Sequence, residues 1–227
     1  MQWLRLMYAE MSFPGDFFYA ESKIKFVREG EENDMDTKNI MIVGVGGQGT
    51  LLTSRILGGI AREEGYDVKI SEVHGMAQRG GSVVTFVRFG SQVAEPIVEE
   101  GQADILIAFE QLEALRYAHF LKKDGVLIVN EQKIEPMTVT AGMAEYPENI
   151  LETLNAQYRT VAMDARKEAE KLGNGKVFNT VVIGATAKHM DFPKENWEKV
   201  IRKTVPPKTV EINLSAFEAG YAMEVDE

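Results

Sequence analysis

The sequence predicts an α/β fold, in which helices cover both faces of a mostly parallel β-sheet. Three observations support this prediction. Short apolar runs alternate with segments of helical periodicity. A glycine-rich loop joins the first apolar run to the first helical segment. The 227 residues, 44% of them hydrophobic, suffice for one sizeable core. Together they indicate a Rossmann-like, doubly wound sheet.

Six segments are predicted as strands. The first, fourth and fifth are continuous apolar runs, typical of strands that are covered on both faces. The second alternates polar and apolar residues, and the third is rich in β-branched and aromatic side chains. The fifth follows a turn at Asp124 and Gly125, and the sixth is a further candidate. In chain order they are residues 39–43, 68–73, 83–89, 104–109, 126–129 and 158–163.

Seven segments are predicted as helices. The first places Leu51 and four other apolar residues on one stripe and ends at Gly65, which suits the C′ position. In the fourth, Asp164 suits the N-cap and Gly173 the end. Two prolines, at 206 and 207, stop the sixth. In chain order they are residues 50–64, 111–121, 148–157, 165–172, 178–190, 195–203 and 214–223.

Residues 1–36 differ from the rest, because their aromatic residues follow no sustained period and an acidic run ends them. We interpret them as an N-terminal extension to a domain over residues 37–227. The extension is either a start-site artefact, with the true start at Met35, or a short amphipathic arm that binds a partner.

The composition excludes several classes of protein. A formal charge of −10 and a pI near 5.0 disfavour binding to nucleic acid or to an anionic membrane. The chain has no cysteine, which excludes disulfides, thiol nucleophiles and iron–sulfur clusters held by its own thiolates. No apolar run reaches the roughly 20 residues of a membrane span, and early charges interrupt any signal peptide. A cytoplasmic protein is therefore expected.

The loop after the first strand matches the pattern G-x-G-x-x-G, which comprises Gly44, Gly46, Gly47, Gln48 and Gly49 around one valine. Glycines permit a tight turn and the close approach of an anion, and the following helix offers free N–H groups and partial positive charge. A phosphate site and a tight turn that merely packs against the sheet both fit this pattern.

The type of nucleotide is a separate question. Glu72, near the end of the second strand, is placed to hold the ribose of a dinucleotide. A glutamate at this position of a strand often just faces solvent, so an NAD(P) site is the less favoured interpretation. The sequence contains no G-x-x-x-x-G-K-[ST] motif, so a Walker-type NTPase is not supported.

A second glycine-rich segment joins the second and third strands. Arg79 is a fixed cation with bidentate geometry for phosphate or carboxylate, and the neighbouring glycines expose backbone N–H groups. A salt bridge within an ordinary turn is the alternative. Because both loops follow strands at one sheet edge, we favour anion binding or a subunit contact. The candidate residues are His74, Gln78, Arg79, Gly80, Gly81 and Ser82.

Other chemically notable residues suggest no further site. The three histidines do not cluster with carboxylates at metal-ligand spacing, so no metal site is predicted. No hydrolase signature stands out, and no catalytic residue is assigned to this chain. Methionines are expected to fill the core. Asn179 and Thr180 lie in an apolar helix, where they either bond a backbone group or reach a subunit interface.

The two glycine segments resemble the gamma-type domain of the 2-oxoacid:ferredoxin oxidoreductases. The likeness rests on IVGVGGQG at residues 42–49 and SEVHGMAQRGGSV at residues 71–83. It extends over about residues 36–223, and the two motifs at this spacing are more specific than either alone. Further matches occur at residues 103–110, 112–115, 129–130, 172–174, 205–208 and within 213–217.

This resemblance implies the small subunit of a hetero-oligomer that decarboxylates an aryl pyruvate such as indolepyruvate, forms the acyl-CoA and reduces ferredoxin, as in aromatic amino acid catabolism. Thiamine diphosphate and [4Fe–4S] clusters are implied on a large alpha subunit. Coenzyme A is implied as a co-substrate whose diphosphate suits the first glycine loop and Arg79. Two alternatives stay open: the gamma subunit of a pyruvate, 2-ketoisovalerate or 2-oxoglutarate enzyme, and a stand-alone nucleotide-binding module.

Overall fold

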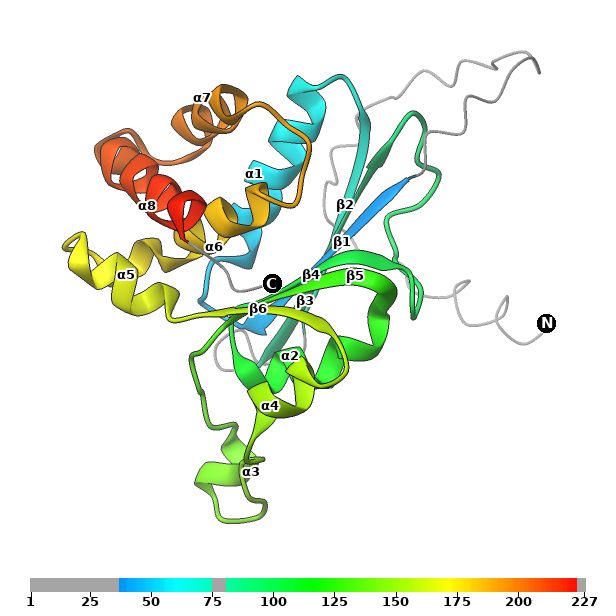
Figure 1. Ribbon diagram of the computed structural model, residues 1–227, viewed down its shortest axis with the longest axis vertical. Coiled ribbons are helices and arrows are strands. Elements are labelled where there is room, and N and C mark those ends of the chain that lie inside the picture. The colour runs from blue at the N-terminus through cyan, green and yellow to red at the C-terminus, as the bar shows by residue number, and fades with distance from the viewer. Residues whose placement is uncertain (1–36, 75–80, 224–227) are drawn as a thin grey trace, which may run out of the picture. The chain divides into compact units, whose positions relative to one another are not determined.

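Figure 1 shows the computed structural model, which describes residues 37–74 and 81–223. A six-stranded sheet with the order β2-β3-β1-β4-β5-β6 forms its centre. The expected start at Met35 and the domain boundary at residue 36 lie outside the described residues and stay predictions. The strands are β1 (Lys38–Val45), β2 (Asp67–His74), β3 (Ser82–Gly90), β4 (Ala103–Ala108), β5 (Leu121–Asn130) and β6 (Arg159–Met163).

The sheet is mostly parallel, as predicted. β1, β4, β5 and β6 pair in parallel, whereas β3 is antiparallel to both of its neighbours, β1 and β2. A parallel pair needs a crossover of a dozen or so residues, and the connection between His74 and Ser82 is shorter than that. β3 therefore returns beside β2 and separates it from β1.

Helices cover both faces of the sheet (Figure 1). Among the described helices, five lie on one face: α1 (Thr50–Glu63), α5 (Ala165–Lys171), α6 (Phe178–Ala187), α7 (Lys194–Thr204) and α8 (Val210–Ala222). Two lie on the other: α2 (Gln111–Tyr117) and α4 (Ile150–Asn155). A short helix, α3 (Met137–Thr140), lies on an excursion after β5, and three 3₁₀ turns are η1 (Ala118–Phe120), η2 (Gly175–Val177) and η3 (Pro207–Thr209).

The side chains on the two faces of β1 belong to two separate hydrophobic cores. Ile40 and Ile42 pack with the α1, α6 and α8 side, and Met41 and Val43 pack with the α2 side. All four are at most 1% exposed, as expected for a strand covered on both faces. The continuous apolar run of the sequence thus reflects burial on both sides.

Helices α6 and α8 approach each other at two glycines. A Cβ on Gly184 would collide with the carbonyl oxygen of Phe217, and one on Gly220 would collide with the carbonyl oxygen of Val181. These residues let the two backbones touch, which explains why every residue of α6 is buried.

The predicted turn at Asp124 and Gly125 is wrong. β5 begins at Leu121, so the preceding helix ends sooner than predicted, and the two turn residues lie inside the strand. The β4–β5 register shifts at this point, and Lys122 Nζ donates to Asp104 Oδ1 of β4 over 2.8 Å. Leu121 pairs with Ala103 and Val126 with Ile105, so the polar residues between them form an irregularity inside β5.

Two predictions of burial are also wrong. Leu51 was placed on the apolar stripe of the first helix, yet it is 47% exposed, whereas Thr53 and Ser54 are buried. Their hydroxyls donate to the helix carbonyls of Gly49 and Leu51, which allows a polar pair inside. Met137 and Met143 were expected in the core, but the excursion around α3 leaves both largely exposed.

In the described part of the chain, no helix combines the length and the hydrophobicity required to cross a membrane. The cytoplasmic location remains a prediction.

Candidate functional site

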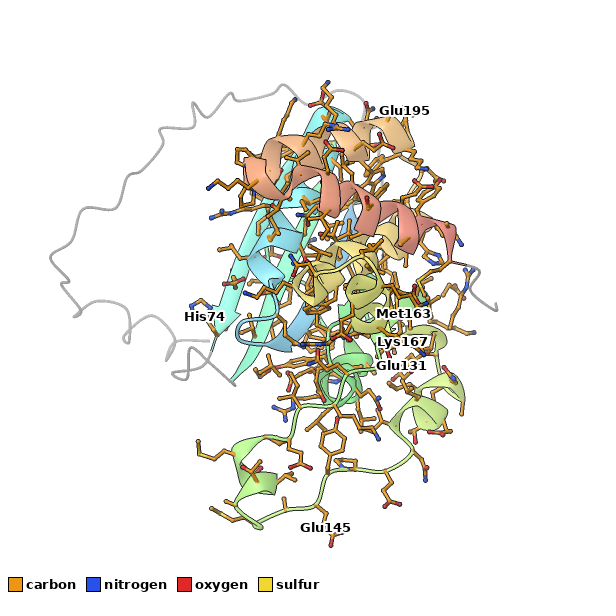
Figure 2. The ribbon with its side chains drawn as sticks, turned by 90° about the vertical axis from the view of Figure 1, so that its left-hand side faces the viewer. His74, Glu131, Glu145, Met163, Lys167 and Glu195 are labelled. Atoms are coloured by element: carbon orange, nitrogen blue, oxygen red, sulfur yellow. The ribbon has the colours of Figure 1, made fainter. Side chains whose placement is uncertain are left out.

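The two glycine-rich segments meet at the edge of the sheet where the parallel strands end. The Gly46 N–H donates to the carbonyl of Gly81 over 2.9 Å, and Val45 of β1 pairs with Ser82 of β3. In Figure 2, His74 and Met163 mark this edge, at the ends of β2 and β6. The structure thus brings Gly44, Gly46, Gly47, Gln48 and Gly49 close to Gly81 and Ser82. The predicted residues Gln78, Arg79 and Gly80 lie outside the described residues.

The backbone of the first loop requires glycine at two positions. Gly47 and Gly49 have φ values of +104° and +89°, in the left-handed region that other residues rarely adopt. Gly44 has a different role, because a Cβ there would lie 2.8 Å from Gln48 Oε1 and 3.2 Å from the Phe109 Cβ. Gly44 is thus a packing glycine, whereas Gly47 and Gly49 shape the turn into α1.

The side chain of Gln48 holds the loop in place. Its Oε1 accepts from the Val45 N–H over 2.7 Å, and its Nε2 donates to the Phe109 carbonyl over 3.0 Å and to Gln132 Oε1 over 3.2 Å. The loop is thereby tied to the ends of β4 and β5. A direct contact of Gln48 with a ligand stays a prediction.

An open pocket of about 420 Å³ lies beside the loop, with Glu72 on its wall. The interpretation that Glu72 merely faces solvent is wrong: its side chain is 21% exposed, and its Oε2 accepts from the hydroxyls of Thr85 at 3.1 Å and Thr50 at 3.3 Å. His74 Nδ1 lies 3.4 Å from Glu72 Oε1. The pocket is lined by Gly46, Gly47, Gly49, Thr50, Leu51, Glu72, His74 and Val83.

The electrostatics of this pocket are mixed. The N-terminus of α1 has no side-chain cap, so its first N–H groups and partial positive charge favour an anion. Glu72, which accepts from the Thr50 hydroxyl, places a carboxylate in the same pocket, which favours a hydroxyl donor. The arrangement suits a ligand that bears both a negative group and hydroxyl groups, as a nucleotide does.

Ser82 faces the other side of the sheet. Its Oγ donates to Glu113 Oε2 of α2 over 2.5 Å, and Arg116 lies 3.6 Å from the same carboxylate. Burial raises the pKa of Glu113 above its ordinary value of 4.5, although the hydrogen bond from Ser82 and the charge of Arg116 oppose that rise.

The raised pKa of Glu113 predicts a pH dependence of stability. The cost of ionising the buried carboxyl is absent below its unfolded pKa near 4.5 and fully present above its folded pKa. Relative to wild type, Glu113→Gln should therefore gain stability as the pH rises from about 4 to about 8. Urea unfolding across this range measures the difference.

Glu63→Gln is the matched control for this pH series. The pKa of Glu63 is lowered by its hydrogen bonds to Lys199 and Lys203, so wild type gains from that carboxylate as the pH rises and the variant should lose relative to it. Parallel pH trends in the two variants would contradict the assignment for Glu113.

Two further polar residues at this edge, Glu110 and Asn130, are structural. Glu110 is 1% exposed and N-caps α2 through the Glu113 N–H. Asn130 donates to the Phe109 carbonyl over 3.1 Å and accepts from the Ala165 N–H over 3.1 Å. They connect the ends of β4 and β5 to the segments that follow.

The structure also brings Asn179 to this site, although it was not among the predicted site residues. It lies in the first turn of α6, and its side-chain nitrogen occupies the space that a Cβ on Gly49 would need. The signal in the sequence was a polar pair inside an apolar helix. Thr180 of that pair donates to Asn213 of α8 over 2.7 Å.

A doubly wound sheet with joined glycine loops is the framework of one class of oxidoreductase subunit. Residues 39–223 match the family model described as pyruvate ferredoxin/flavodoxin oxidoreductase, and the chain belongs to this family. The solved gamma subunit of a keto/oxoacid ferredoxin oxidoreductase from Geobacter sulfurreducens has a TM-score of 0.61 and 28% identity; the match covers 81% of this chain and 96% of that one.

Within the family, the chain is similar to the protein named indolepyruvate oxidoreductase subunit IorB of Thermococcus kodakarensis. The two are 44% identical over 192 residues, which cover 82% of this chain and 95% of the relative. The 2-oxoglutarate synthase subunit KorC of Methanothermobacter marburgensis is 32% identical over 186 residues, covering 81% and 94%. The resemblance stated from the sequence is confirmed.

Proposed function

We propose that this chain is the small subunit of an indolepyruvate oxidoreductase, which converts aryl pyruvates to aryl-acetyl-CoA and reduces ferredoxin. The greater identity to the indolepyruvate subunit than to the 2-oxoglutarate subunit supports this substrate class. A gamma subunit for pyruvate, 2-ketoisovalerate or 2-oxoglutarate, and a stand-alone nucleotide-binding module, are the less favoured candidates.

The proposed redox groups belong to a larger alpha subunit. Without cysteine, this chain cannot supply the thiolates that hold a [4Fe–4S] cluster. On the partner, thiamine diphosphate would supply the carbanion chemistry of decarboxylation and the clusters would carry electrons to ferredoxin. The proposed role of this chain is to bind coenzyme A.

The observation that carries the proposed coenzyme A contact is the hydrogen bond between Gly46 and Gly81, 2.9 Å long. It holds both glycine segments at one rim, beside the uncapped N-terminus of α1. A diphosphate placed there would receive backbone N–H groups from the first loop. Arg79, two residues before Gly81 in the sequence, is the proposed cation.

Co-expression with the large subunit tests the function. We expect a brown complex that reduces a viologen dye when given coenzyme A and indolepyruvate, with lower kcat/KM for pyruvate, 2-ketoisovalerate and 2-oxoglutarate. A higher kcat/KM for one of those three acids would overturn the proposed substrate and assign the enzyme to that 2-oxoacid. A colourless monomer that binds NADH would support the binding module instead.

Removing the proposed cation should weaken coenzyme A binding selectively. Arg79→Ala in the assembled enzyme is expected to raise the KM for coenzyme A about tenfold or more, because a charge-assisted hydrogen bond contributes about 1.5–3 kcal/mol. The KM for indolepyruvate should change little. Arg55→Ala removes an equal charge from an exposed position of α1 and is the control. Equal KM values for coenzyme A in wild type and Arg79→Ala, with intact assembly, would contradict the contact.

A further inference from the structure

Asn179 is an almost fully buried amide that reaches the start of another helix. Asn179 is 5% exposed, and its helix, α6, lies against α1 (Figure 1). A Cβ on Gly49 would overlap Asn179 Nδ2 and would lie 3.4 Å from its Cγ. The amide nitrogen therefore sits beside the N-cap of α1, at the loop to which we assign the anion.

Hydrogen bonds fix which atom of the amide faces Gly49. Asn179 Oδ1 accepts the backbone N–H of Thr180 over 2.9 Å, and a backbone N–H can only donate. The nitrogen must then point towards Gly49. Thr180 is in turn held by Asn213 of α8, whose Nδ2 donates to the Thr209 carbonyl over 2.7 Å. The amide is thus oriented before any ligand arrives.

The Asn179 nitrogen has unused donors. It forms no hydrogen bond with the described residues, and it is not one of their completely enclosed polar atoms. The N–H groups of Thr50 and Leu51, in the first turn of α1, also lack helical acceptors, since the first such bond runs from the Thr53 N–H to the Gly49 carbonyl over 3.1 Å. A buried amide whose N–H has no acceptor among the described residues, next to an uncapped helix start, points to an acceptor on a ligand.

We infer that Asn179 Nδ2 donates directly to the anionic group held at the N-terminus of α1, and that this group is a phosphate of a nucleotide ligand. The inference rests on the proposed function, in which that ligand is coenzyme A. The Glu72 carboxylate accepts from Thr50 at this helix end, so it favours ligand hydroxyls on its own side. Asn179 adds a neutral donor on the α6 side.

The decisive variant is Asn179→Asp in the assembled enzyme. Aspartate keeps the oxygen that accepts from Thr180, but it replaces the donor by a negatively charged acceptor. We expect the affinity for coenzyme A, and for inorganic pyrophosphate as the isolated anion, to fall at least tenfold by isothermal titration calorimetry. The expected fall corresponds to the loss of one hydrogen bond to a charged group of coenzyme A. Because indolepyruvate does not form this bond, its KM should stay within about twofold of the wild-type value.

Thr180→Val separates a binding role from a structural one. It removes the hydroxyl that bonds Asn213 but keeps the backbone N–H that Asn179 Oδ1 accepts, so it should lower the melting temperature without a change in the affinity for coenzyme A. Should Asn179→Asp misfold, Asn179→Ser replaces it, with the same expected loss of affinity.

The possible failures are distinguishable. Tight binding of coenzyme A by wild type that is unchanged in Asn179→Asp would overturn the inference about Asn179 alone. Equal losses of affinity in Asn179→Asp and Thr180→Val would also overturn it, because they would show a structural effect. A wild-type complex that turns over indolepyruvate but binds neither coenzyme A nor pyrophosphate would overturn the proposed ligand together with the inference.

Discussion

Replacing Gly184 by alanine is expected to destabilise the protein by about 3 kcal/mol or more. The added Cβ would strike the carbonyl oxygen of Phe217 and lie 2.7 Å from the backbone nitrogen of Tyr221. Both are backbone atoms of α8, so no side-chain rotation relieves the clash, and the two helices must separate. Urea unfolding followed by circular dichroism measures the loss.

Gly59→Ala in α1 is the matched control for this crossing. Its Cβ would meet only Cγ1 of Val200, 2.8 Å away, a side-chain atom that a small adjustment of α1 against α7 moves aside, and no backbone atom of the neighbouring helix. Alanine also favours the helix by roughly 0.5–1 kcal/mol over glycine, so the net change should stay within about 1 kcal/mol. Equal unfolding midpoints for Gly184→Ala and wild type would show that α6 and α8 do not meet as described.

Replacing Glu110 by glutamine is expected to cost about 3 kcal/mol. The carboxylate accepts three hydrogen bonds: from the Glu113 N–H over 2.9 Å, from the Ile134 N–H over 3.0 Å and from the Tyr146 hydroxyl over 2.5 Å. An amide has one oxygen, so its NH₂ group must face at least one of these donors. In addition to the lower unfolding midpoint, proteolysis within residues 131–149 should become faster, because Glu110 anchors both ends of that excursion.

Tyr146→Phe is the control that removes a single one of these bonds. Its cost should be about 1 kcal/mol, since the other two donors keep their acceptor. Burial and the hydrogen bond to Glu110 both raise the pKa of Tyr146, so its hydroxyl remains a donor over the usual pH range. A loss in Tyr146→Phe as large as that in Glu110→Gln would contradict the assignment of three separate hydrogen bonds to Glu110.

Elements governed by local pattern could be predicted well. The runs that became β1 and β4 are continuous in the sequence, and Asp164 N-caps α5 as expected, with its Oδ1 accepting from the Lys167 N–H over 2.9 Å. The start of β5 was predicted wrongly, because Leu121 joins the strand through its pairing with Ala103 of β4, and the polar residues after it form an irregularity in the register. The predicted burial of Leu51 was wrong because the buried face of α1 includes two hydroxyl side chains that form hydrogen bonds within the helix.

The candidate site followed the same division. The glycine loop, its position after a strand and its likeness to a family could be predicted, because glycine's backbone freedom is a property of the residue itself. The hydrogen bonds of Glu72 could not, since Thr85 meets it only through the antiparallel pairing of β2 with β3. The contact of Asn179 with Gly49 likewise depends on the packing of α6 against α1.

By itself, the sequence determined the alternating α/β pattern, the glycine turn into a helix, the absence of thiolate ligands and the family resemblance. These are properties of single residues or of short windows, so they survive without knowledge of the fold. Only the tertiary structure decided that β3 separates β1 from β2, that Glu72 is held by two threonines, and that Asn179 faces the loop. Such contacts join residues far apart in the chain. They arise from the pairing of strands and the packing of helices, and neither produces a periodic pattern in the sequence that would reveal the partners.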